Sequence, residues 1–110
     1  MQKGKLNPEI FRIHADFCRV LCNATRIMII CLLAEGEKSV SELADILERP
    51  IPNVSQHLRV MRDKSAVVSR KEGQNVYYKI ANNKFIQGCA LIREGIIEQL
   101  NLRHEKISGT

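Results

Sequence analysis

The chain has 110 residues, of which 45% are hydrophobic and 26% are charged, and its formal net charge is +5. These values are typical of a single globular domain. The longest apolar run, Ile27–Ala34, has eight residues, fewer than the roughly 18–20 that a membrane-spanning helix needs. Because the N-terminus also lacks a secretory pattern, we expect a cytoplasmic protein, not a membrane protein, with four reduced cysteines.

The net charge is confined to residues 49–79. That stretch has seven basic and two acidic residues, whereas the remainder of the chain has ten of each. A protein that binds a polyanion needs such localised charge, because each phosphate neutralised by Lys or Arg releases a condensed counterion. An ordinary solvated surface with an uneven charge distribution gives the same count. The geometry of the elements that carry the charge favours the first interpretation.

The first helix is predicted over residues 8–22. Asn7 is a good N-cap, and Pro8 suits the first helical position, where the missing amide costs nothing. We expect an apolar face on this helix. Its residues are Phe11, Ala15, Cys18, Leu21 and Cys22.

Two more helices are predicted before residue 50. Asn23 caps the second, over residues 24–35, and Gly36 ends it because glycine adopts the left-handed conformation freely. Ser39 and Glu42 fit a capping box for the third.

A fourth helix is predicted over Pro52–Asp63, with a hairpin and a fifth helix after it. Its inward residues are Val54, Leu58 and Met61. Val67–Lys71 and Asn75–Ile80 are rich in strand-forming residues and are joined by a glycine turn at 72–74, which predicts a β-hairpin. The last helix, about residues 83–103, has one long apolar stripe. The stripe consists of Phe85, Cys89, Ile92, Ile96 and Leu100.

The predicted fold is mainly α with a small β-hairpin wing, in the order α-α-α-α-β-β-α. This is a winged helix-turn-helix, in one DNA-binding domain over residues 1–110. The apolar stripes of residues 8–22 and 83–103 are larger than a small central core can cover. We therefore expect a homodimer through the first and last helices, which places two reading helices about one turn of DNA apart.

Three segments carry a family resemblance. Residues 21–37, Val-Ser-Gln-His-Leu-Arg-Val-Met-Arg at 54–62 and Arg-Lys-Glu-Gly-Gln-Asn-Val-Tyr-Tyr at 70–78 resemble the ArsR/SmtB family of winged-helix repressors. The resemblance covers about residues 8–104. It implies a small dimeric repressor that releases double-stranded DNA when it binds a metal ion or when a thiol is oxidised.

The outward face of the fourth helix and the wing supply the predicted DNA contacts. They are Asn53, Ser55, Gln56, His57, Arg59, Arg62, Lys64, Arg70, Lys71 and Gln74. Gln56 can pair with adenine through two hydrogen bonds, and Arg59 with guanine or a phosphate. Taken alone, Gln56 is equally well explained as a solvated surface amide. His57 lies near the inner edge of the helix, where we favour a packed, hydrogen-bonded histidine.

Three departures from the family pattern surround the fourth helix. Pro50, Ile51 and Pro52 replace a Ser-Gln-Pro start, so two polar DNA contacts are missing. Glu48 and Ser65 stand where the family often has glycine. These differences bear on which operator is bound, not on the mode of binding.

The cysteines allow two sensor hypotheses. His14, Cys18 and Cys22 recur every four residues and, with Cys89, would offer soft ligands to a metal ion or metalloid. Alternatively, Cys31 resembles a second-helix cysteine of persulfide-responsive members of the family. Reduced cysteines are also common core residues. We therefore assign no certain cofactor and favour a buried, inert Cys31.

No sequence pattern supports an enzyme. The spacing of Cys18 and Cys22 differs from the Cys-x-x-Cys of thiol oxidoreductases, and Cys89 has no nearby His and acidic partner. Two binding functions remain as alternatives to an inducible repressor. They are a winged-helix protein-interaction module and a constitutive regulator without a cysteine sensor.

Overall fold

The protein is described by a computed structural model, which covers residues 6–103. Its elements are α1 (Pro8–Leu21), α2 (Ala24–Leu33), β1 (Lys38–Ser39), α3 (Val40–Leu47), α4 (Ile51–Asp63), β2 (Val67–Glu72), β3 (Asn75–Ile80) and α5 (Asn83–Leu102). The predicted winged helix-turn-helix is confirmed, although α2 ends two residues earlier than predicted and α4 begins one residue earlier. None of the helices described is both long and apolar enough to cross a membrane.

Short polar side chains begin most of the helices. The side-chain oxygens of Asn7, Asn23 and Asn82 accept backbone amides at the start of α1, α2 and α5, at 3.0, 3.2 and 2.9 Å. At α3, Ser39 and Glu42 form the expected capping box, in which each side chain accepts the backbone amide of the other residue at 3.0 Å. These local signals explain why the predicted helix starts are confirmed.

The two turns that flank α4 are left-handed without glycine. Glu48 has a φ of 53° and Ser65 has a φ of 64°, a conformation that glycine adopts freely and other residues adopt at a cost. These are the two positions at which the sequence departs from a glycine pattern. Between them, α4 starts behind Pro50, which has no side-chain cap bond.

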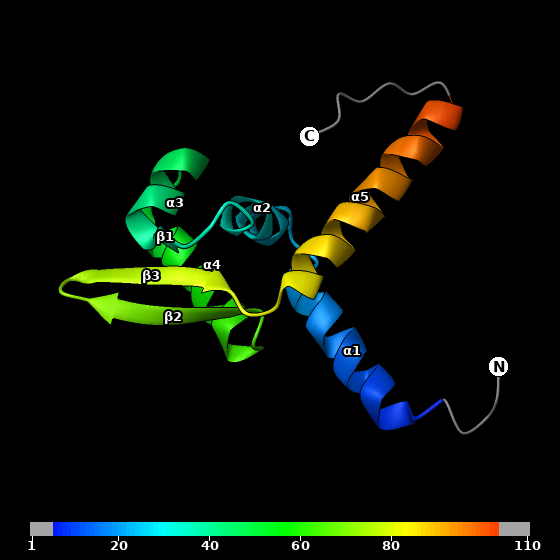
Figure 1. Cartoon of the computed structure of the whole chain (residues 1–110), viewed down its shortest axis with the longest axis horizontal. Helices are drawn as coiled ribbons and strands as arrows, with labels where there is room; N and C mark the ends of the chain where they lie inside the picture. The colour runs from blue at the N-terminus through cyan, green and yellow to red at the C-terminus, as the bar shows by residue number, and fades with distance from the viewer. Residues whose placement is uncertain (1–5, 104–110) are drawn as a thin grey trace.

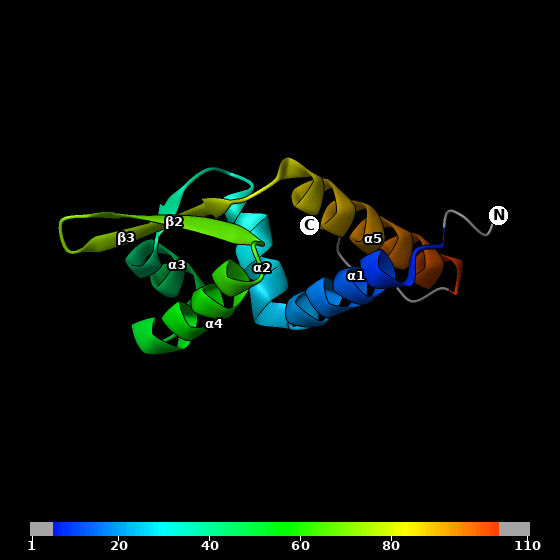
Figure 2. The same ribbon diagram turned by 90° about the horizontal axis from the view of Figure 1, so that it is seen from below.

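The sheet has three strands in the order β1-β3-β2, and β1 was not predicted. β2 and β3 are antiparallel and joined by a two-residue turn in which Gly73 has a φ of 62°, as a tight hairpin turn requires. Val67 and Tyr78 are buried on the face of the sheet that packs on the helices. Figure 2 shows β2 and β3 along one side of the winged half, with α3 and α4 beneath them.

The core lies between the sheet and α2, α3 and α4. Its largest fully buried side chains are Ile29, Ile30, Leu43, Leu58, Met61, Val54 and Val67. Three of these belong to α4, so the inward face of that helix is fixed by apolar burial.

Helices α1 and α5 extend away from this core and diverge from one another (Figure 1). They meet near the core through Phe17 and Phe85, whose ring centroids lie 4.6 Å apart. As expected from its apolar stripe, α1 is only partly covered by the core, because Phe11 and Cys18 are exposed and Val20 is its one buried residue. No residue of α5 is buried. A single chain therefore leaves much of the apolar surface of both helices uncovered.

Candidate nucleic-acid interface

Helix α4 separates its core residues from its polar residues. Val54, Leu58 and Met61 are fully buried, as predicted. Three of the predicted DNA contacts, Asn53, Gln56 and Arg59, are exposed. Ser55 is half-buried and borders a shallow hollow between the N-terminal ends of α3 and α4 and the tip of the wing, where Gln74 also lies. The helix thus presents amide and guanidinium groups to solvent from a rigidly packed support.

His57 is a packed, hydrogen-bonded histidine, as favoured from the sequence. Its Nδ1 accepts a hydrogen bond from Nε of Arg26 at 3.1 Å, so this ring nitrogen carries no proton. Burial holds the pKa of His57 below its usual value, and the positive charges of Arg26 and Arg49 lower it further. The neutral imidazole therefore joins α4 to α2.

The pKa of His57 makes stability depend on pH. Because the folded state disfavours its protonation, the free energy of unfolding should be fully retained above about pH 6.5 and fall as the pH drops toward the folded-state pKa. Urea unfolding at about pH 7.5 and about pH 5.5 measures this loss. His57→Asn keeps an acceptor near Nδ1 but cannot be protonated, so it should lose less. An equal loss in both proteins would assign the effect to other groups.

Two cations were predicted to follow the reading surface at the end of α4. Arg62 is exposed, which agrees with a role in DNA contact. Lys64, the C-cap residue, instead forms an ion pair with Asp16 of α1 at 2.6 Å. This pair lowers the pKa of the Asp16 carboxyl, chiefly through the hydrogen bond from Lys64. Lys64 therefore ties α4 to α1 in the free protein.

Arg70 of the wing is held by two carboxylates. Its guanidinium forms ion pairs with Glu37, at 2.8 Å, and with Glu72. It also lies over the ring of Tyr77, 4.6 Å from the centroid. The hydrogen bond from Arg70 is the main reason why the pKa of Glu37 is lowered. The charge of Arg70 is thus compensated locally, a feature that the sequence did not reveal.

Strand register puts Arg70 and Lys71 on opposite faces of the wing. Arg70 is opposite Tyr77 in the register, and Lys71 is opposite Val76. Because side chains alternate along a strand, Lys71 shares the face of buried Tyr78, toward α3 and α4, and Arg70 points to the other face. Lys71 forms no ion pair with any residue of the described range 6–103.

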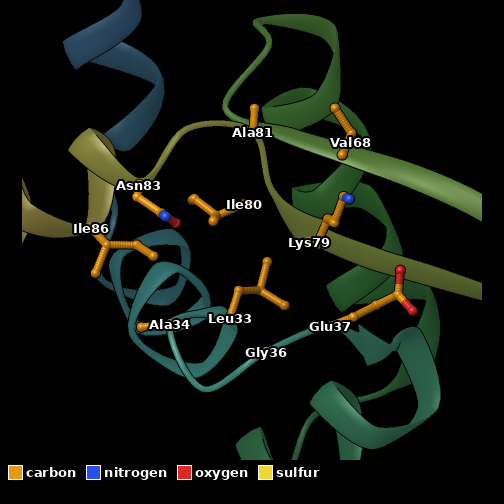
Figure 3. A pocket seen from close by; sticks show the side chains of 10 residues that line it. All are labelled: Leu33, Ala34, Gly36, Glu37, Val68, Lys79, Ile80, Ala81, Asn83 and Ile86. Carbon is orange, nitrogen blue, oxygen red and sulfur yellow. The ribbon is translucent and has the colours of Figure 1, made fainter.

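The face that carries Arg70 also borders a cavity of about 430 Å³ at the base of the wing (Figure 3). Val68 and Lys79 of the sheet lie on one side of it, and Leu33 of α2 and Ile86 of α5 lie on another. This cavity is separate from the exposed face of α4. It brings together none of the predicted DNA contacts.

The two wing cations should differ in their contribution to DNA affinity. Lys71→Ala should lower the slope of log affinity against log salt by about one unit, as the loss of one phosphate contact does. Arg70→Ala should lower it less, because Glu37 and Glu72 already compensate its charge. Titration of a random duplex at several salt concentrations measures both slopes. A larger decrease of the slope for Arg70→Ala than for Lys71→Ala would show that Arg70, not Lys71, makes the phosphate contact.

Comparison with known proteins decides the family. Residues 23–64 match the bacterial regulatory protein arsR family. An HTH-type transcriptional regulator of Methanocaldococcus jannaschii is 34% identical over 95 residues, which span 86% of this chain and 99% of that protein. The chain belongs to the arsR family. The family match covers α2, α3 and α4.

Two further comparisons concern the length of the chain and its fold. The HTH-type transcriptional regulator KmtR of Mycobacterium tuberculosis is 41% identical over 67% of this chain, but the match spans only 52% of KmtR. The solution structure of a homodimeric winged helix-turn-helix DNA-binding domain from Mycobacterium bovis has a TM-score of 0.74. It is 25% identical, and the match covers 94% of each chain. The present chain thus spans about half of the length of KmtR and nearly all of the M. bovis domain.

Two serines stand at the start of α3, and neither suits a soft metal. The buried Ser39 hydroxyl accepts the amide of Glu42 at the start of α3. The second serine, Ser41, is exposed on the first turn of the same helix. Hydroxyl groups are poor ligands for soft metals. The Ser39 side chain thus serves the capping box and not a soft-metal site.

Three of the four cysteines border one apolar cavity. Cys18 of α1, Cys22 directly after α1 and Cys89 of α5 line a space of about 410 Å³, together with Leu21, Ile27, Ile92, Arg93 and Ile96. Burial raises the pKa of the Cys89 thiol, so its thiolate is disfavoured. Cys31 is exposed, and the expectation of a buried core cysteine is therefore wrong. The aliphatic residues around it in sequence turn to other sides of α2.

The proposed four-ligand metal set is not assembled in the single chain. Within residues 6–103, no three His, Cys, Asp or Glu side chains come together closely enough to hold a metal ion. His14 is exposed and does not line the cavity that the three cysteines share. The residues present in one chain therefore do not form a complete metal site.

Sequence reasoning missed Asp16, Arg26 and Glu37, which hold predicted DNA-contact residues in place. Their partners are Lys64, His57 and Arg70, which lie 48, 31 and 33 residues away in sequence. Helical and strand periodicity report only which face a residue occupies. The signal available was only that these three residues are charged, which is too common to single out.

Proposed function

We propose that this chain is a sequence-specific, DNA-binding transcriptional repressor that acts as a homodimer in the cytoplasm, where its DNA lies. The observation that carries the proposal is α4 itself. Its inward side is fixed by Val54, Leu58 and Met61, and its exposed side carries Asn53, Gln56 and Arg59. A helix of this kind, presented by a second bracing helix and flanked by a wing, fits the major groove.

The charge distribution supports nucleic acid over a protein partner. Residues 49–79, which hold the net charge of the chain, form α4, β2, the wing turn and most of β3. The polar groups on α4 include an amide and a guanidinium, which are the groups that pair with adenine and guanine edges. A protein-interaction module would need neither feature.

The homodimer rests on the uncovered apolar surface of α1 and α5. On α1, the side chains of Ile10, Phe11 and Ile13 are 53%, 48% and 57% exposed. On α5, Leu91 and Ile92 are 66% and 67% exposed. Apolar patches of this kind usually mark protein interfaces. A two-fold dimer through these helices would set two copies of α4 roughly 34–36 Å apart, the spacing of successive major grooves.

Fluorescence anisotropy with a random duplex at low salt tests the proposal directly. We expect binding whose affinity falls linearly on a log-log plot as salt rises, because phosphate contacts release counterions. Operator fragments selected from genomic DNA should bind more tightly than random duplex at the same salt. Sedimentation equilibrium should give a dimer. A protein that ignores every duplex at low salt would be a protein-interaction module instead.

For the inducer, we propose a soft metal ion, a metalloid or another thiol-reactive compound that acts at the three-cysteine cavity. The cavity supports this because Cys18, Cys22 and Cys89 approach it from α1 and α5, the two helices of the proposed dimer. Thiolates are preferred ligands of soft metals. A compound bound there would alter how the two helices pack. One chain lacks a complete metal site, so metal binding requires a rearrangement or a second copy.

Thiol counting and DNA titrations test the inducer. Anaerobically purified protein should lose operator affinity on addition of cadmium, arsenite or a persulfide, and Cys89→Ser should remove the response. Cys31→Ser is the matched control, because this exposed thiol lies outside the cavity. If no addition changes operator affinity, the protein is a constitutive regulator.

A further inference from the structure

Arg26 contacts three helices at one point. It lies in the first turn of α2, where its backbone amide donates to Asn23 at 3.2 Å. Its Nη1 donates to the backbone carbonyl of Val20, in the last turn of α1, at 2.9 Å. Its Nε donates to Nδ1 of His57, on α4, at 3.1 Å. One guanidinium therefore joins the end of α1 to the helix that carries the proposed DNA contacts.

Both side-chain hydrogen bonds of Arg26 are expected to be stable. Carbonyls in the last turn of a helix have no partner along that helix, and Arg26 satisfies one of them. His57 is half-buried and flanked in sequence by exposed Gln56 and fully buried Leu58, so it lies at the boundary between the reading face and the core. Hydrogen bonds with a charged donor are stronger than neutral ones.

A second contact links the same two helices. Lys64, at the end of α4, pairs with Asp16, one turn before Val20 on α1. Helix α4 is therefore attached to α1 through Arg26 near its middle and through Lys64 at its end. Because the apolar core already fixes which side of α4 faces inward, these two attachment points add a direct polar restraint on its direction relative to α1.

We propose that Arg26 is a positioning residue of the reading helix, which sets the direction of α4 by bridging Val20 of α1 and His57. The inference rests on the proposed function, in which α4 reads DNA and α1 contributes to the dimer. It deepens that function because Arg26 then transmits a change in the packing of α1 to the reading surface.

The arginine fork is required for this bridge. Nε and Nη1 point in fixed directions within one plane, so a single side chain can serve two acceptors on different helices. A lysine ammonium retains the charge but not this geometry. Arg26→Lys therefore distinguishes the two roles. It should break a bridge between two helices, but it should preserve a simple phosphate contact, which either cation could make.

The first measurement uses the free protein and needs no DNA. Hydrogen exchange of the backbone amides of α4 should be faster in Arg26→Ala and in His57→Ala than in the wild type, because both changes remove the bridge. Lys84→Ala is the matched control, since it removes an exposed cation at the start of α5. Unchanged exchange in Arg26→Ala and His57→Ala would overturn the inference even if the protein binds DNA well.

The second measurement is a double-mutant cycle on operator affinity. Arg26→Ala, Arg26→Lys and His57→Ala should each weaken operator binding by about tenfold, or about 1.4 kcal/mol. The double variant Arg26→Ala with His57→Ala should be little worse than either single change, because both remove one interaction. The salt slope on random duplex should stay at the wild-type value for Arg26→Lys and Arg26→Ala.

Two results would show that Arg26 instead contacts a phosphate. They are recovery of affinity in Arg26→Lys and a decrease of about one unit in the salt slope of Arg26→Ala. Additive losses in the cycle would equally contradict the bridge. If the wild-type protein binds no duplex, the proposed function fails, while the hydrogen-exchange comparison still decides whether Arg26 holds α4.

Discussion

Leu58→Ala should lower the free energy of unfolding by about 2–5 kcal/mol, the range for truncating a buried leucine to alanine. The side chain of Leu58 is fully buried and lies in the core between the sheet and α2, α3 and α4. Truncation removes apolar contacts and leaves a cavity that the surrounding helices can close only in part. Urea unfolding of the wild type and the variant measures the difference.

A matched truncation on the same helix provides the control. Ile51→Ala removes a similar amount of apolar side chain, but Ile51 is 51% exposed at the first turn of α4. It should therefore destabilise the protein by well under half as much, because less surface leaves water on folding. Both variants must be compared at one protein concentration, since the stability of a dimer depends on it. Equal losses would show that Leu58 is not a core residue of α4.

The features predicted correctly from the sequence are local. Asn7, Asn23 and the Ser39–Glu42 box act on amides within three residues, so the chain itself specifies these helix starts. The face of α4 is also local, because Val54 and Leu58 recur at helical spacing and one side of the helix must be buried. The exposure of Gln56 follows from the same periodicity.

The features that were missed depend on distant parts of the chain. β1 has two residues, too few for a periodic pattern, and it exists because Lys38 and Ser39 pair with β3. The contacts of Arg26, Lys64 and Arg70 with His57, Asp16 and Glu37 were missed for the same reason, because these partners lie far away in the sequence.

The apolar faces of α1 and α5 were predicted, as was the failure of the small core to cover them completely. Hydrophobic periodicity shows that a helix has an apolar face, but it does not show whether the chain itself covers that face. Phe11, Cys18 and Cys22 lie on such a face and remain exposed in one chain. In the proposed dimer, a second copy would cover part of it. The four-ligand metal set stays a prediction, because Cys18, Cys22 and Cys89 line one cavity in the single chain whereas His14 lies outside it.

The second large effect is expected on DNA recognition. Gln56→Ala should weaken binding to the operator by about 1–3 kcal/mol, the value of one good two-bond contact to a base. Gln56 is neutral and exposed, and it points away from the side of α4 that carries the core residues Val54 and Leu58, so its loss changes neither the charge nor the packing of the helix. Affinity for random duplex should therefore stay unchanged, as should the salt slope. Anisotropy titrations of both duplexes at several salt concentrations measure these quantities.

The contrast between the two duplexes is what assigns Gln56 to base recognition. A glutamine that only contacts phosphate would, when removed, weaken operator and random duplex equally. A solvated surface amide would have no effect on either. Gln87→Ala, which removes an exposed amide from α5, is the matched control and should bind both duplexes like the wild type. Equal losses of affinity for both duplexes in Gln56→Ala would show that Arg59 or the shape of the DNA, and not Gln56, provides sequence recognition.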